Sequence, residues 1–99
     1  MFSRKLEIQA KELEDKLDEQ PLIVDVRKLD EYNKSHICGA IHIPLEQIEN
    51  YNPQQEVYFV CHSGRRSRVA ALILQNRGFE AKSMAGGMLE WKGQVEEEK

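Results

Sequence analysis

The sequence of 99 residues predicts an α/β fold, with a mostly parallel sheet and helices on both of its faces. Two short apolar runs, the β-branched LIVDV (22–26) and EVYFV (56–60), are typical of strands that are buried on both sides. Segments with helical spacing alternate with such runs, and parallel neighbours need crossovers of this kind. The length fits a single domain over residues 1–99.

The elements follow in order from the amino terminus. Residues 9–20 carry apolar side chains at helical spacing on a charged background, and Pro21 ends this helix. After the strand at 22–26 we expect a short helix over 28–34, a short strand over 40–44 and a helical turn or two over 45–51.

The second half continues the alternation. Beyond the strand at 56–60, residues 66–78 indicate a helix that stops at Gly78, and residues 80–84 indicate a short strand. Residues 88–98 are expected to form a final helix, whose acidic end VEEEK would be frayed and solvated.

Charge and hydropathy limit the function classes. The 14 Lys and Arg residues against 17 Asp and Glu residues, a net charge of -3, argue against a nucleic-acid partner, so any anion site must be local. The longest apolar run, VAALIL (69–74), is too short to span a membrane, and the charged start does not resemble a signal peptide. We therefore expect a cytoplasmic protein without a membrane partner.

The two cysteines, Cys38 and Cys61, are expected to be reduced and unpaired. Cys38 precedes a predicted strand and Cys61 follows one, so they should lie at opposite ends of a parallel sheet, roughly 15 Å apart. A disulfide requires Cα atoms within ~7 Å. No metal site is expected, because His36, Cys38, His42, Cys61 and His62 include no C-x2-C pair and Cys61 and His62 are adjacent.

The segment CHSGRRS (61–67), called the cysteine loop below, carries the clearest chemical signal. Cys61 directly follows a strand, and a helix begins a few residues later, so the loop must curl tightly with Gly64 supplying the conformational freedom. Such a loop turns backbone N–H groups inward at a helix N-terminus, which makes an anion cradle with Cys61 at its rim. This environment favours a reactive thiolate.

A plainer interpretation stays open from these residues alone. Cys61 could be a core cysteine, Gly64 a turn residue, and the arginines at 65, 66 and 68 a solvated helix start. Arginines in the first turn of a helix are electrostatically unfavourable unless an anion offsets them.

Three ordered segments resemble the signatures of the single-domain rhodaneses, a family of sulfurtransferases. LIVDVRKLDEYNKSHICGAIHIP (22–44) resembles the amino-terminal signature, CHSGRRS the active-site loop and GGMLEW (86–91) the carboxyl-terminal signature. The matching positions of the first segment are Asp25, Arg27, Glu31, Tyr32, His36, Ile37, Gly39, Ala40 and Pro44. Two positions depart from the family pattern, Ser35 for the usual glycine and Cys38 for a frequent proline.

The resemblance implies a five-stranded parallel sheet and a catalytic Cys61. This cysteine would take sulfane sulfur from a small anionic donor such as thiosulfate and pass it, as a persulfide, to cyanide, a thiol or a sulfur-accepting protein. Neither a metal nor an organic cofactor is needed. The residues expected to bind the substrate are His62, Ser63, Gly64, Arg65, Arg66 and Ser67, with Arg66 attracting the donor.

Other matched residues are expected to support the structure. Asp25, Arg27 and Glu31 would form a carboxylate–guanidinium network that fixes the first helix crossover. Gly86 and Gly87 would allow close backbone approach beside the cysteine loop. Trp91 and His36 are expected to be packing residues with polar handles.

Two rival functions remain. Phosphatases and arsenate reductases of related fold have arginine six residues after the cysteine, where this chain has Ser67, so that activity is the weaker interpretation. A persulfide relay that docks to a partner protein is the other alternative, and retention of Cys61 is compatible with it.

Overall fold

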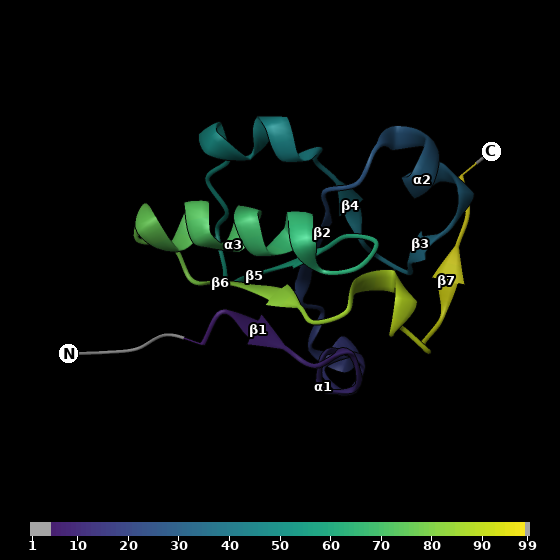
Figure 1. Cartoon of the computed structure of the whole chain (residues 1–99). Coiled ribbons are helices and arrows are strands. Elements are labelled where there is room, and N and C mark those ends of the chain that lie inside the picture. Colours follow the sequence, from purple (N-terminus) through teal and green to yellow (C-terminus); the bar gives the residue numbers. More distant parts are fainter. Residues whose placement is uncertain (1–4, 99) are drawn as a thin grey trace.

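Five parallel strands form the central sheet, in the order β1-β6-β5-β2-β4 (Figure 1). The computed structural model describes residues 5–98 of the chain. The strands of this sheet are β1 (Glu7–Ile8), β2 (Leu22–Asp25), β4 (Ile41–His42), β5 (Val57–Val60) and β6 (Ala81–Met84). The predicted α/β class with a five-stranded parallel sheet is therefore confirmed.

Helices connect these strands and cover both faces of the sheet. The α-helices are α1 (Ala10–Asp15), α2 (Leu29–Lys34) and α3 (Arg65–Asn76), and the 3₁₀ helices are η1 (Leu17–Glu19), η2 (Leu45–Asn50) and η3 (Gly87–Leu89). In Figure 1, α3 and α1 lie on opposite sides of the strands. The helix predicted over 45–51 is a 3₁₀ helix, and the one predicted over 66–78 begins at Arg65.

The alternation of side chains along the central strand β5 divides the core in two. Phe59 packs with Leu74 of α3 on one face, in a cluster that also contains Cys61. Tyr58 points to the other face and packs with Leu13 of α1. Both faces of β5 are buried, as its uninterrupted apolar sequence predicts. Within residues 5–98, each helix falls short of the length and hydrophobicity that a membrane span requires.

The final helix predicted over 88–98 is wrong. The chain forms only η3 and then the strand β7 (Val95–Glu96), which pairs antiparallel with β3 (His36–Ile37). The helix is interrupted because the chain turns back on the buried indole of Trp91, whose Nε1 donates to the carbonyl of Gln94 at 3.2 Å. Gly93 lies against the same ring, where a Cβ atom would come within 2.6 Å of it. Val95 and Glu96 of the acidic end thus form a strand and not a frayed helix end.

Candidate functional site

The thiol of Cys61 lies at the carboxyl end of β5 and receives two backbone hydrogen bonds. The N–H groups of Gly64 and Ser67 donate to Sγ at 3.0 Å and 3.4 Å. The Ser67 hydroxyl lies 3.3 Å from the same sulfur. Cys61 is only 1% exposed, so it lies at the floor of the cysteine loop and not at its rim, because it continues the buried strand β5.

The sharp turn of the cysteine loop depends on Gly64. This residue has φ of 100° and is the N-cap of α3, so the chain reverses there and the helix begins at once. A Cβ atom at Gly64 would lie 3.1 Å from the backbone nitrogen of Gly86. The N–H groups of Gly64 at the N-cap and of Ser67 in the first turn of α3 thereby point toward the sulfur, with the positive end of the helix dipole behind them.

A pair of buried hydroxyl groups extends from the thiol to the neighbouring strand. Ser67 Oγ lies 2.7 Å from Ser83 Oγ of β6, and both residues are fully buried. Ser67 was a predicted substrate-binding residue, and its side chain contacts the sulfur. Ser83 was not among the predicted site residues, although a serine inside a short buried strand is a signal for a polar partner.

Arg66, the residue expected to attract the donor, forms an ion pair with Glu31 of α2. Its Nη1 donates to Oε1 at 3.1 Å and its Nη2 to Oε2 at 3.4 Å. The hydrogen bond lowers the pKa of Glu31 below its usual value and raises the pKa of Arg66. The guanidinium charge beside the cysteine loop is therefore largely offset by a carboxylate.

The predicted network of Asp25, Arg27 and Glu31 is divided in two. Arg27 forms a buried bidentate pair with Asp25, with Nε–Oδ1 at 2.9 Å and Nη2–Oδ2 at 2.8 Å. Arg27 Nη2 also donates to the carbonyl of Ser35 at 2.6 Å, which fixes the end of α2. Glu31 contacts Arg66 instead, so it links α2 to the cysteine loop.

The glycine-containing loop after β6 packs directly on the cysteine loop. Met88 N–H donates to the carbonyl of Cys61 at 2.8 Å, and Leu89 N–H donates to that of His62 at 3.2 Å. At Gly87, where φ is +60°, a Cβ atom would lie 2.4 Å from the oxygen of Cys61, so only glycine fits. The preceding residue, Gly86, also has positive φ. The loops after β2, β5 and β6 thus meet at one end of the sheet.

The remaining predicted binding residues lie on the outer side of the cysteine loop. His62, Ser63 and Arg65 are exposed. Among the hydrogen bonds found within residues 5–98, those to Sγ come from Gly64 and Ser67 and not from these three side chains. Beside Arg66 a cleft of about 400 Å³ opens between the start of α2 and the end of β4, and it is lined in part by Arg27, Lys28, Leu29 and Pro44.

Both cysteines are free thiols in the structure. Cys38 lines a separate cleft with Leu17 and Pro21, next to the amino end of β2, whereas Cys61 lies at the carboxyl end of the neighbouring strand. The N–H group of Cys38 donates to the carbonyl of Gln94 at 3.3 Å.

Comparisons with known proteins agree with this geometry. The family profile described as "Rhodanese-like domain" matches residues 9–94. The chain is 43% identical over 84 residues to the "Putative sulfur carrier protein YrkF" of Bacillus subtilis, covering 80% of this chain and 45% of that protein. It is 32% identical over 97 residues to the "Thiosulfate sulfurtransferase GlpE" of Coxiella burnetii, covering 93% and 89%. The crystal structure of a rhodanese-like domain protein from Staphylococcus aureus has a TM-score of 0.83 at 32% identity, covering 95% and 99%.

Proposed function

The chain belongs to the rhodanese-like domain family of sulfurtransferases and sulfur carriers, and from this premise we propose that it transfers sulfane sulfur through a persulfide on Cys61. The observation that carries the proposal is the set of donors around Sγ: the Gly64 and Ser67 N–H groups and the Ser67 hydroxyl. These fixed donors stabilise a sulfur anion without reorganisation during the reaction.

The reaction has two displacements at sulfur. The Cys61 thiolate attacks the outer sulfur of thiosulfate, a new S–S bond forms, and the sulfur–sulfur bond of thiosulfate breaks to release sulfite with the electron pair. Cyanide or a thiolate then attacks the outer sulfur of the persulfide. The Cys61 thiolate leaves and is regenerated, so neither a metal nor an organic cofactor takes part.

Thiosulfate as the donor is supported by the name of the relative GlpE, a thiosulfate sulfurtransferase, and by Lys28 and Arg66, which line the cleft next to the cysteine loop. A phosphatase-like reaction is less well supported. The sixth residue after the cysteine is Ser67, whose side chain lies buried under the sulfur, whereas a tetrahedral oxyanion needs a cation there. A reducing compartment such as the cytoplasm suits this chemistry, because the thiol must be free.

A persulfide relay to a partner protein is the second candidate. Two observations favour it: Glu31 offsets the charge of Arg66, and Leu89 is 65% exposed although its N–H group contacts the cysteine loop. Single exposed apolar side chains are common on protein surfaces, so Leu89 supports docking only through its position beside the cysteine loop. The name of YrkF, a sulfur carrier protein more than twice as long as the matching region, also supports this role.

The test is an intact mass measurement after incubation with thiosulfate. We expect one added sulfur atom that dithiothreitol removes, absent in Cys61→Ser and retained in the matched control Cys38→Ser. Sulfur on Cys38 instead would contradict the proposal. Steady-state transfer from thiosulfate to cyanide then separates the candidates, since an enzyme turns over rapidly and a relay loads once and waits for its partner.

A further inference from the structure

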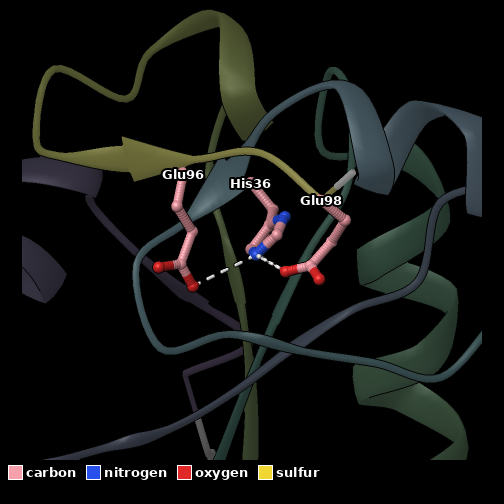
Figure 2. Close-up of side chains that lie close together, drawn as sticks. All are labelled: His36, Glu96 and Glu98. Atoms are coloured by element: carbon pink, nitrogen blue, oxygen red, sulfur yellow. Dashed lines mark hydrogen bonds and ion pairs between the residues drawn. The ribbon is translucent and has the colours of Figure 1, made fainter.

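A histidine and two glutamates that the proposed transfer does not use meet where β3 pairs with β7. His36 Nε2 lies 3.3 Å from Glu96 Oε1 and 3.4 Å from Glu98 Oε2. Figure 2 shows both carboxylates directed at the same ring nitrogen. Among residues 5–98 this is the group of His, Cys, Asp and Glu side chains whose ligand atoms all lie within 4.8 Å of one another.

The backbone builds this arrangement. His36 and Glu96 are direct partners in the antiparallel register of β3 and β7, so their side chains lie on the same face. Glu98 follows two residues later, and its N–H group donates to the carbonyl of Asn33 at 2.8 Å, which keeps the chain extended beside α2. Successive side chains of an extended chain point to opposite faces. Glu98 therefore lies on the same face as Glu96, and Glu97 lies on the other face.

The tautomer of His36 is determined by its other nitrogen. Nδ1 lies 2.8 Å from the carbonyl oxygen of Tyr32, which can only accept, so Nδ1 carries the proton. The Tyr32 ring stacks on the imidazole at 3.8 Å with an interplanar angle of 9°, and this holds the ring orientation. In the neutral imidazole, Nε2 then has a lone pair that faces two carboxylate oxygens.

Three acceptors that face one another are stabilised by a positive charge, which is either a proton on Nε2 or a metal ion between them. The His36 side chain is 0% exposed, so bulk water does not reach its ring. The side chains of Glu96 and Glu98 are 49% and 51% exposed. An Nδ1–H group bonded to a backbone carbonyl is also the usual outer contact of a metal-binding histidine.

We infer that this group, called the His36 site below, binds a divalent transition-metal ion of the Zn²⁺ type. Ligands at about 2.05 Å in tetrahedral geometry lie roughly 3.3 Å apart, which matches the two nitrogen–oxygen distances. One imidazole and two carboxylates suit Zn²⁺ better than Ca²⁺ or Mg²⁺, which prefer oxygen ligands alone. The exposed side leaves room for water as a fourth ligand.

The His36 site departs from the expectation that the chain holds no metal. That expectation considered only histidines and cysteines. Glu96 and Glu98 were assigned to a frayed helix end, where they would not face His36. The metal would link β7 to β3 and stabilise their pairing. It would take no part in the chemistry at Cys61.

The test is a calorimetric titration of Zn²⁺ into the full chain carrying Cys61→Ser, which removes the reactive thiol as a competing ligand. We expect one saturable site whose affinity falls at least about tenfold in Glu96→Gln and in Glu98→Gln. Glu97→Gln is the matched control, because Glu97 is exposed in the same segment but on the other face, and it should bind as the parent does. The Nε2 resonance of His36 should shift on addition of Zn²⁺.

Two results would overturn the inference. The first is no saturable binding, or equal affinity in the Glu96→Gln, Glu98→Gln and Glu97→Gln variants, which would leave an ordinary ion pair with a protonated His36. The second is loss of binding in Cys38→Ser with no change in the glutamate variants, which would assign the metal to a different ligand set. Amide spectra of each variant would verify that the β3–β7 pairing persists.

Discussion

The cysteine loop and the paired strands β3 and β7 each gather polar groups around one atom, but they are built from opposite kinds of sequence. The cysteine loop surrounds the Cys61 sulfur with N–H and O–H donors from residues 64 and 67, all within one short segment. The β3–β7 pair surrounds His36 Nε2 with acceptors from residues some sixty positions away. The first arrangement follows from one tight turn, and the second needs a strand register.

The two regions also differ in how they are held. The sulfur lies in the core under α3, and the loop after β6 closes over it through the bonds to the carbonyls of Cys61 and His62. β7 is an exposed strand with two register pairs. We therefore expect the cysteine loop to be rigid and to determine the function. The β3–β7 pairing should be removable without a change in sulfur transfer.

The largest effect should come from removing the sulfur itself. Cys61→Ala is expected to lower thiosulfate to cyanide transfer by at least about 10³-fold, because within residues 5–98 no other thiol lies in the cradle. The thermal midpoint should change little, and Cys38→Ala should retain full turnover. Substantial transfer by folded Cys61→Ala would show that the cysteine loop is not the functional region.

The next effect should come from the contact between the two loops. Gly87→Ala is expected to destabilise the protein by about 1 to 3 kcal/mol, because its Cβ atom would clash with the Cys61 carbonyl. Denaturant unfolding measures this change. Gly78→Ala is the matched control, since Gly78 also has positive φ, of 93°, but open space around its Cα atom. Equal losses in both variants would mean that backbone conformation and not the close contact is responsible.

Ending the chain at residue 94 tests whether β7 is separable. Loss of the exposed β7 pairing should cost about 1 kcal/mol of unfolding free energy, and sulfur transfer should be unchanged. The bond from Trp91 to the carbonyl of Gln94 remains in this variant. A fall in kcat along with stability would show that the two regions are coupled.

Glu31 connects the cysteine loop to α2, and removing its charge should increase the attraction of Arg66 for the thiosulfate anion. Glu31→Gln leaves the guanidinium without an offsetting carboxylate, so kcat/KM for thiosulfate should rise about two- to fivefold. Arg66→Ala should lower it. The proposed donor role of Arg66 fails if neither substitution changes kcat/KM.

The smallest effect concerns pH. The hydrogen bond from Arg66 lowers the pKa of Glu31, so the pair adds stability above the pKa of the unfolded chain, and this is lost as pH falls through the lower folded value. The pair, about one third exposed, should contribute from a few tenths to about 1 kcal/mol. The stability difference between the parent and Glu31→Gln should therefore shrink below about pH 4. A difference that stays constant down to pH 2 would exclude this linkage.

The sequence predicted most of the fold and the tight turn of the cysteine loop, because both follow from local patterns. The buried strands β2 and β5 are continuous apolar runs, and the cysteine loop is marked by Cys61, Gly64 and the helix after it. The partner of Arg66 could not be predicted, since it depends on how α2 packs beside α3. The strand β7 was missed because its partner β3 is two residues long and distant in sequence.

The strand order also determines when the sheet can be completed during folding. β2 and β5, which lie together at the centre, are both present once the first 60 residues have been synthesised. β1 is made first but pairs only with β6, where Glu7 lies opposite Ser83, so this edge must wait for most of the chain. Until β6 is made, the free edge of β5 and the unpaired strand β1 offer backbone groups to other chains. The ion pair between Glu7 and Arg68 at 2.8 Å then holds the late edge strand beside α3.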